Sequence, residues 1–458
     1  MDVSSVFFFL LRLFGQGWGL AADGDRRKHC HALLALVWLF LLVLLWSLDF
    51  FLYLTFFRER VQDMDFSALT IGIQRCYIVA EAIAMLLIAK LIGNQPLRLL
   101  DDIRRLCFLP VEDAIPDAGN GPRKNSLLRR QRYTWQFWGG VLIFWSIAAS
   151  LLLGGLQCYF FINFLASTMM KDNWNWYRVV DVGLVTLPVY VGTVVFFLLA
   201  AVNTILDMLL QMLGVWCALA ISAAFRQVYK DLKALSKAID AHALPGEAAA
   251  MERVEALSAR HLALSQLVNR TDAAFSGVNL LVCLRDFVGF VTGCAALLRA
   301  DEDVTGVNAR FDANARDIAL GVDFLARTTC GAYLAVSMVN CVLRMSAFIR
   351  LTETGKSALR PLSLIFEQVT TLEAKTSMIL ILNRIRGHSL TLTGGGLFSL
   401  DRSFVVTMFG SFFSFFILVY QMQDQKKDIY SVITQDDVHG LAAQVANITR
   451  HILTSPAT

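Results

Sequence analysis

The stretch GGGLFSLDRSFVVTMFGSFFSFFILVYQMQ spans residues 394–423 and decides the fold. It begins with glycines and a charged pair, continues as an apolar run from Phe404 to Gln421, and ends on two glutamines. A bilayer core of about 30 Å needs roughly 20 apolar residues per helical crossing, and this run approaches that length. Because lipid offers no partners to backbone polar groups, the run predicts a membrane helix.

The rest of the chain extends this prediction to an integral membrane protein. Of its 458 residues, 56% are hydrophobic and only 17% charged, and the mean hydropathy is +0.55, which is too apolar for an ordinary water-soluble domain. No run shows the ten-residue alternation of a barrel strand, so the fold class expected is all-α with seven transmembrane helices. The six further runs are Ala32 to Phe57, Leu69 to Ile92, Trp135 to Leu165, Val179 to about Leu219, Ala273 to Leu298 and Gly321 to Ser346.

The distribution of Lys and Arg predicts the orientation. Loops between the runs alternate between rich and poor in positive charge, and the richer side is cytoplasmic by the positive-inside rule. We therefore expect a cytoplasmic amino terminus and an extracellular carboxy terminus. Asn447 lies in a glycosylation sequon of the tail and could be modified there, whereas the sequon at Asn269 falls on the cytoplasmic side and should stay unused.

Helical periodicity continues beyond several of the membrane runs. Apolar residues recur at helical spacing from Phe225 to Ile239, from Val254 to Val268 and from Leu359 to Leu372, with charged residues on the remaining faces. Such half-apolar helices have to bury their stripes, so they predict a cytoplasmic helical bundle. The sequence leaves open whether this bundle is formed within one chain or shared between subunits.

Small and polar residues form a stripe along the seventh run. Its members lie at steps of four, three, four and three residues, which is one face of a helix: Thr407, Ser411, Ser414, Leu418 and Gln421. One interpretation is a water-filled path lined by this stripe, with Leu418 as its apolar constriction. In the other, the hydroxyls bond the carbonyl four residues back or allow close helix packing, with no path at all.

This same stretch resembles the carboxy-terminal signature of the insect-type gustatory receptor family, relatives of the insect odorant receptors. GGLFSLDRS at 395–403 matches the family's approach, and Ser414 to Met422 matches its T-Y-x-x-x-L-x-Q-F-like close, with Ser, Phe, Val and Met in place of Thr, Tyr, Leu and Phe. The resemblance implies tetrameric, ligand-gated, nonselective cation channels whose pore is lined by the seventh helix. It assigns Gln421 to the pore and Leu418 to the gate region, next to Ser414 and Met422. The tail beyond Gln423 is longer than is usual for the family.

These expectations divide the chain into five parts of one membrane domain. They are a cytoplasmic amino-terminal segment (1–31), helices one to six with a ligand pocket and cytoplasmic extensions (32–346), a cytoplasmic helical anchor segment (347–403), a pore-lining seventh helix (404–423) and an extracellular tail (424–458).

Polar residues in the outer halves of the runs predict where a ligand would bind. Ionisable groups at membrane depth are costly and usually face a cavity or a partner. Carboxylates and amides beside aromatic rings suit a polyhydroxylated ligand, so a sugar is the first expectation, although the tryptophans at 174 and 176 also fit an interfacial aromatic belt. The candidate ligand residues are Tyr77, Glu81, Gln157, Trp176, Tyr177, Asp181, Asp323 and Arg327.

Arg285 and Asp286 interrupt the fifth run with two adjacent charges. Neighbours in sequence point to different faces of a helix, so we expect each to pair with another helix rather than with the other. Asp207 and Arg344 are the candidate partners, in a buried polar tie.

Other functional classes are less well supported. A secondary transporter of a small polar solute would use charged residues near the midplane, but it usually shows paired repeats, which this chain lacks. The absence of HExxH, GxSxG and CxxC motifs argues against an enzyme, a cofactor or a metal site, and no basic run suggests nucleic acid. The expected partners are therefore a small tastant, permeating cations, the bilayer of the plasma membrane and related subunits.

Overall fold

The computed structural model describes residues 95–108, 122–169, 179–181, 186–241, 246–298, 313–387, 390–418 and 420–421, together with single positions before residue 95. These parts are almost entirely helical, which confirms the all-α prediction. Four of the helices are long and apolar enough to cross a membrane, and a shorter apolar helix follows at Arg402–Leu418. The first two predicted runs and the tail lie outside the continuous described ranges.

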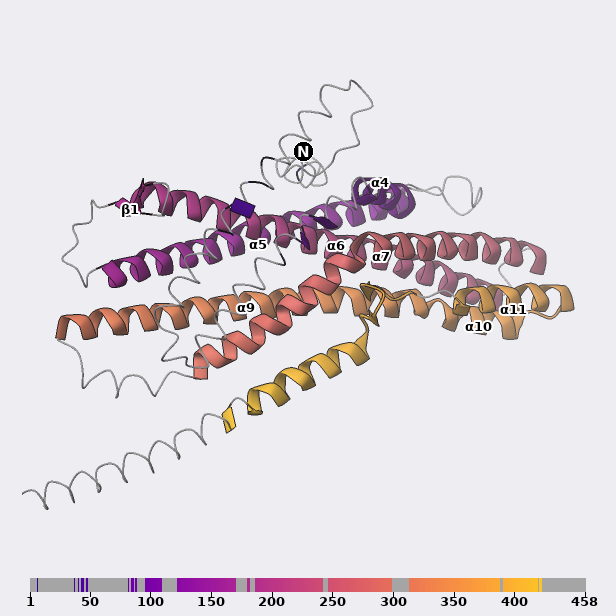
Figure 1. The fold of residues 1–458 in the computed structure, drawn as a ribbon. Coiled ribbons are helices and arrows are strands. Elements are labelled where there is room, and N and C mark those ends of the chain that lie inside the picture. The colour runs from indigo at the N-terminus through magenta and orange to yellow at the C-terminus, as the bar shows by residue number, and fades with distance from the viewer. Residues whose placement is uncertain are drawn as a thin grey trace, which may run out of the picture.

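Four long helices run side by side and form the body of the molecule (Figure 1). They are α5 (Pro122–Met169), α6 (Val189–Asp240), α7 (Glu247–Leu298) and α9 (Ala313–Ser357). Together they contain the predicted third, fifth and sixth runs and most of the fourth. Helix α6 packs against α5, α7 and α9, and its residues from Leu209 to Ala218 are all buried, so it is the centre of the core.

The structure corrects the start of the fourth run. Residues Val179–Asp181 form strand β1, which pairs antiparallel with β2 (Thr186–Pro188), and the helix begins only at Val189. Proline lacks a backbone N–H and fits a position just before or inside the first helical turn, so Pro188 separates the hairpin from α6.

Short helices gather at the other end of the long helices from β1 (Figure 1). Helix α4 (Gln95–Phe108) packs on α6 and α7, and α10 (Leu359–Gln368) and α11 (Leu372–Gly387) follow α9. The predicted extensions of the fourth and fifth runs are confirmed, because α6 and α7 continue through them without a break. The predicted stripe from Leu359 to Leu372 is interrupted, since α10 ends at Gln368 and Leu372 is 81% exposed at the start of α11.

Hydrogen bonds to Glu247 hold the junction between α10 and α11. The carboxylate of Glu247, at the start of α7, accepts hydrogen bonds from the backbone N–H groups of Thr370 and Thr371, both at 3.1 Å, and from both hydroxyls. These N–H groups precede the first turn of α11, where a carboxylate is favourable. The contact fixes α11 to the start of α7.

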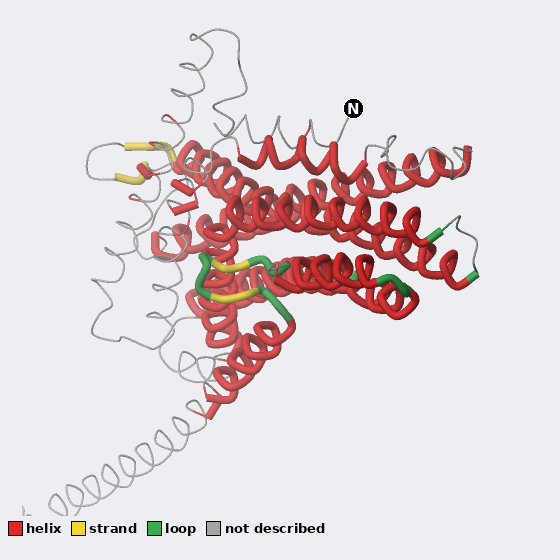
Figure 2. The backbone as a smooth tube through the Cα atoms, turned by 90° about the vertical axis from the view of Figure 1, so that its right-hand side faces the viewer, coloured by secondary structure: helices red, strands yellow, loops and turns green. Residues whose placement is uncertain are grey.

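A second hairpin connects α11 to the last helix (Figure 2). Strand β3 (Thr393–Gly394) pairs antiparallel with β4 (Phe398–Ser399), with Gly394 opposite Phe398. The turn needs two residues with positive φ, and Gly395 and Gly396 supply them at 62° and 73°.

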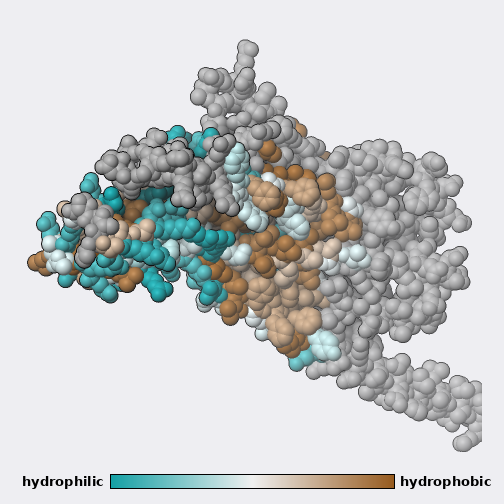
Figure 3. Space-filling view, turned by 180° about the vertical axis from the view of Figure 1, so that it is seen from behind, coloured by the Kyte–Doolittle hydropathy of each residue, from teal (hydrophilic) through white to brown (hydrophobic). Residues whose placement is uncertain are grey.

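The surface divides along the length of the bundle. In Figure 3 hydrophilic residues gather over one end and hydrophobic residues cover the middle. On α5 the exposed side chains include Phe137, Phe144 and Leu152, and Phe144 is 74% exposed. Large apolar side chains exposed together mark a surface covered by another apolar phase, and a bilayer explains a belt of this kind.

Candidate functional site

The last helix begins at a charged cap. Asp401 Oδ1 accepts the backbone N–H of Phe404 at 3.0 Å, and Asp401 Oδ2 accepts the hydroxyl of Ser399 at 3.1 Å. The first of these bonds holds the pKa of the Asp401 carboxyl below its ordinary value. Next to the cap, Arg402 forms an ion pair of 2.7 Å with Glu353 on α9. The helix therefore starts from a fixed point on the body of the chain.

The hairpin before this cap is bound to α7. Thr393 donates its backbone N–H to Asp272 Oδ1 at 2.5 Å, and its hydroxyl lies 3.0 Å and 2.9 Å from the two carboxylate oxygens. One and two turns further along α7, the carbonyl of Ser276 accepts the N–H of Gly395 at 2.8 Å and Asn279 donates to the carbonyl of Thr393. We call these contacts the hairpin clamp.

The last helix has one face packed on its own chain and one face turned away from it. Met408 and Phe412 are buried, and Phe412 stacks on Phe290 of α7 with ring centroids 4.4 Å apart. The predicted stripe lies on exposed positions, and the side chain of Leu418 is 52% exposed. The exposed stripe residues are Thr407, Ser411, Ser414, Leu418 and Gln421.

Two hydroxyls of the stripe also bond to their own helix. Thr407 donates to the carbonyl of Ser403 at 3.0 Å, and Ser411 donates to the carbonyl of Thr407 at 2.9 Å. The backbone bonding considered from the sequence is therefore present, and it coexists with an outward-facing stripe. Met422, the last predicted pore residue, lies outside the described residues.

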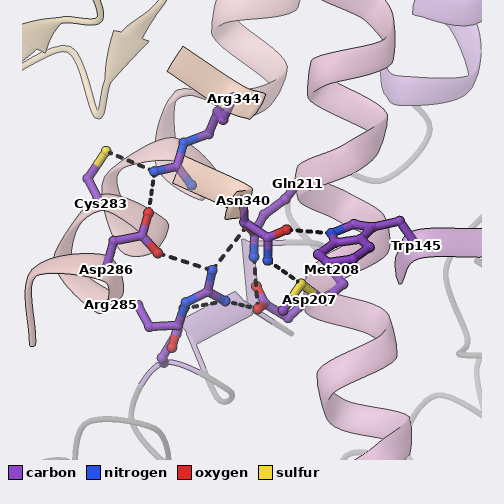
Figure 4. A network of polar contacts seen from close by, with 10 residues as sticks. Trp145, Asp207, Met208, Gln211, Cys283, Arg285, Asp286, Asn340 and Arg344 are labelled. Atoms are coloured by element: carbon purple, nitrogen blue, oxygen red, sulfur yellow. Dashed lines mark hydrogen bonds and ion pairs between the residues drawn. The ribbon is translucent and has the colours of Figure 1, made fainter. Parts of the chain in front are cut away.

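A second polar region lies inside the bundle (Figure 4). Arg285 of α7 lies at its centre: Nη1 forms an ion pair with Asp207 of α6, and Nη2 donates to Gln211 Oε1 at 3.0 Å. Gln211 in turn donates to Asp207 at 2.9 Å. Arg285 Nη1 also lies 3.6 Å from Oε1 of Glu81. We call Glu81, Asp207, Gln211, Arg285, Asp286 and Arg344 the buried cluster.

Asp286 joins α9 to the same cluster. Its Oδ2 accepts Arg344 Nη2 at 2.6 Å, and its Oδ1 lies 3.4 Å from Arg285 Nη2. The predicted partners Asp207 and Arg344 are thus confirmed. The expectation that Arg285 and Asp286 do not pair is wrong, because the long arginine side chain turns back beside its neighbour (Figure 4).

An amide pair extends the polar contacts to α5. Trp145 donates its indole N–H to Asn340 Oδ1 at 2.8 Å, and Asn340 lies 2.9 Å from the sulfur of Met208. Sequence reasoning missed Trp145, Gln211 and Asn340. Gln211 carried one signal, since it follows Asp207 by four residues on the same helix face.

Several buried polar atoms of the cluster accept or donate no hydrogen bond within the described part of the chain. They are Glu81 Oε1, Asp207 Oδ1, Arg285 Nε, and Nε and Nη1 of Arg344. Polar atoms left unbonded in a dry interior are costly, and such sites are often functional or hold water. The cluster is therefore a candidate site as well as a tie between helices.

Among the described side chains, Glu81 is the predicted ligand residue that lies in this cluster. Asp181 lies in strand β1, and Gln157 lies on α5. Asp323 and Arg327 lie on α9, with side chains that the structure does not describe. Tyr77, Trp176, Tyr177 and Asn447 lie outside the described residues. Among the described residues, no group of three or more His, Cys, Asp and Glu is arranged to hold a metal ion.

Solved structures share this arrangement of helices. The insect olfactory receptor OR5 from Machilis hrabei in complex with eugenol is 13% identical, with a TM-score of 0.56, and the match covers 91% of this chain and 97% of that one. A second structure of OR5 from Machilis hrabei is 12% identical, also with a TM-score of 0.56, and the match covers 92% of this chain and 97% of that one. Identities this low establish the fold alone. No curated protein sequence matches the chain.

A family model settles the relationship that the fold suggests. The model of the 7tm chemosensory receptors matches residues 24–426, which is most of the chain and includes all the described helices. These proteins are membrane receptors and not enzymes. This protein belongs to the 7tm chemosensory receptor family.

Proposed function

We propose that the protein is a gustatory-type chemoreceptor of the plasma membrane: a ligand-gated, nonselective cation channel opened by a small extracellular tastant. The observation that carries this proposal is the outward face of the last helix. Thr407, Ser411, Ser414 and Gln421 are polar, lie on an apolar helix and are exposed on the isolated chain. Polar groups facing lipid are unfavourable, so this face calls for water or another subunit.

A ring of subunits supplies both. Around a symmetry axis, four copies of the stripe line a hydrated path and expose no polar face to lipid. The seven-helix topology with a cytoplasmic amino terminus belongs to the same proposal. The exposed apolar residues Leu372, Ile379 and Leu380 on α11 support contacts between subunits at the end of the bundle away from β1.

Leu418 is the gate in this proposal, and Gln421 with Met422 lies beside it. An apolar ring of leucines closes a narrow path by excluding water, and a neighbouring ring of amides admits cations with weak discrimination. Ser414 lies one turn before the gate on the same face.

The ligand in this proposal is a sugar or another polyhydroxylated compound. The support is the set of polar and aromatic residues predicted at the outer ends of the helices, Tyr77, Gln157, Trp176, Tyr177, Asp181, Asp323 and Arg327 among them. An extracellular tail places Asn447 on the side of the membrane where N-glycosylation occurs. At Asn269 the sequon is part of α7, and Thr271 is buried and bonded to the carbonyl of Leu267.

The test is to express the chain alone in cells and record membrane current while sugars, amino acids and bitter compounds are applied. We expect a cation current that reverses near zero in symmetric salt. Leu418→Ala should conduct without ligand, whereas Leu397→Ala, at the exposed hairpin tip, should stay closed at rest. A silent Leu418→Ala with normal surface expression would remove Leu418 as the gate.

A secondary transporter remains the competing proposal, supported by the buried charges of Asp207, Arg285 and Asp286. It predicts saturable, ion-coupled uptake of a solute without channel-like current. Measuring uptake and current in the same cells separates the two.

A further inference from the structure

The charges of the buried cluster do not balance. Within the described residues it contains three carboxyl groups, from Glu81, Asp207 and Asp286, and two guanidinium groups, from Arg285 and Arg344. Each of these side chains is buried or nearly so, with Asp207 the most accessible at 14%. A buried charge is tolerated only when it is paired and hydrogen-bonded. With every group ionised, one negative charge is left over.

The contacts identify which carboxyl group is least compensated. Asp286 has Arg344 at 2.6 Å and Arg285 at 3.4 Å, while Asp207 receives bonds from both Arg285 and Gln211. Among the described residues, the one ion-pair partner of Glu81 is Arg285, at 3.6 Å, which is beyond hydrogen-bond distance. Its Oε1 accepts no hydrogen bond from any described residue, although the side chain is only 6% exposed. The excess negative charge therefore falls on Glu81.

We propose that Glu81 is a proton-binding site, so that the buried cluster holds one exchangeable proton at neutral pH. The proton forms an O–H bond on the carboxylate and removes the excess charge, and no other group changes its charge. Among the described residues, the titratable and charged groups near Glu81 are Arg285 and Asp286 of α7 and Tyr333 and Arg344 of α9, and Asp207 of α6 shares Arg285 with it. Tyr333 carries no charge, and the two arginines are paired with the two aspartates. Glu81 is therefore left without a cation of its own.

Release of this proton would change how the helices are held. Arg285 is the common partner of Glu81, Asp207 and Asp286, so a charged Glu81 competes with the other two for one guanidinium group. These residues come from the segment around residue 81, from α6 and from α7, and Asp286 continues the chain of contacts to α9. In a receptor with the function proposed above, on which this step rests, the tastant-evoked current would then depend on pH.

Infrared spectroscopy of the purified full-length chain in lipid nanodiscs tests the proton directly. A protonated carboxyl group has a C=O stretching band that an ionised one lacks. We expect this band at neutral pH, and we expect it to fade as the pH is raised. It should be missing in Glu81→Gln and unchanged in Glu373→Gln, which alters an exposed carboxylate on α11.

Two results would overturn the proposal. One is a wild-type spectrum with no such band at neutral pH, which decides the matter even if Glu81→Gln does not fold. The other is a band that remains in folded Glu81→Gln, because the proton would then lie on a different carboxyl group.

The coupling to function needs a separate measurement. Currents evoked by a fixed stimulus should change with pH in the wild type and in Glu373→Gln, and should lose that dependence in Glu81→Gln. An unchanged pH dependence in a conducting Glu81→Gln would contradict the coupling. A wild-type chain that folds, shows the band and never conducts would instead contradict the channel proposal and leave the proton site standing.

Discussion

The buried cluster and the stripe of the last helix both place polar groups in an apolar helical protein, and they differ in where those groups find partners. In the cluster, Asp207, Arg285, Asp286 and Arg344 meet one another across three helices. Along the stripe, Ser414 and Gln421 are exposed, and Ser411 donates to the carbonyl of Thr407 on its own helix. The first region therefore makes its ion pairs within one chain, whereas the second presents polar side chains on the surface of the isolated chain.

Removing one charge from the buried cluster should have the largest effect on the stability of the fold. Arg344→Met would leave Asp286 without its nearest cation, and removing one partner of a buried ion pair costs about 3–5 kcal/mol. We expect little folded protein, measured as the monodisperse fraction and the melting temperature in detergent. Arg386→Met, on an exposed position of α11, is the matched control and should behave as wild type.

A double variant tests whether the lost stability comes from the unpaired charge of Asp286. Arg344→Met combined with Asp286→Leu removes both charges, and an apolar pair of similar volume is often as stable as the ion pair it replaces. Recovery of folded protein is expected. A single variant as stable as wild type would show that the cluster contributes nothing to the fold.

Weakening the hairpin clamp, which binds the start of the last helix to α7, should have an intermediate effect on stability. Thr393→Val removes the hydroxyl bonds to both oxygens of Asp272 and keeps the backbone bond, at a cost of about 1–3 kcal/mol. Thr376→Val is the control, since that exposed hydroxyl bonds to the carbonyl of Leu372 one turn earlier on the same helix. The melting temperature should fall for Thr393→Val alone, and equal melting of the two variants would contradict the clamp.

The cap of the last helix should contribute less. Asp401→Ala removes the side-chain bond to the N–H of Phe404, which is worth about 1 kcal/mol. Because the folded pKa of Asp401 lies below the unfolded one, this stabilisation is complete above the ordinary carboxyl pKa of about 4 and is lost as the pH falls through the folded value.

Melting curves from neutral pH to below about 4 check that sign. The difference between wild type and Asp401→Ala should shrink with acidification. Asp401→Asn keeps an acceptor that does not titrate, so it should lose less stability on acidification than wild type. A difference that grows in acid would be inconsistent with this cap.

The stripe itself should affect stability least. Ser414→Ala and Gln421→Ala change exposed side chains, so their effect on the fold should stay within about 0.5 kcal/mol. Their effect on current should be clear, and Gln421→Glu should raise the preference for divalent cations by adding a carboxylate ring. Stable variants with wild-type permeation would place the stripe outside the conduction path.

Much of this architecture could be predicted from the sequence because membrane helices follow strong local rules. The long apolar runs predicted α5, α7 and α9, and the periodicity from Phe225 to Ile239 predicted the continuation of α6. The hairpin at residues 179–188 was missed, because its valines and leucines look like the start of a span. Its proline and glycine were the overlooked signals of a turn.

The site was harder to predict because it joins residues that are far apart in the chain. The partners of Arg285 and Asp286 could be inferred, since unpaired charges in a span have to find each other. The bond between Asp272 and Thr393 crosses 121 positions and carries no periodic signal. Trp145 and Asn340 are ordinary residues of apolar helices, and only their packing brings them together.

The unbroken course of α6 has a mechanical consequence. At 1.5 Å per residue, its 52 residues form a rod about 78 Å long, which carries Asp207 of the buried cluster in one half and Asp240, bonded to Gln368 of α10, at its end. The helix is continuous over this length. A tilt of only about 5° about one end moves the other by roughly 7 Å over that length. A small tilt of α6 about the end beside β2 would therefore displace the end that contacts α10.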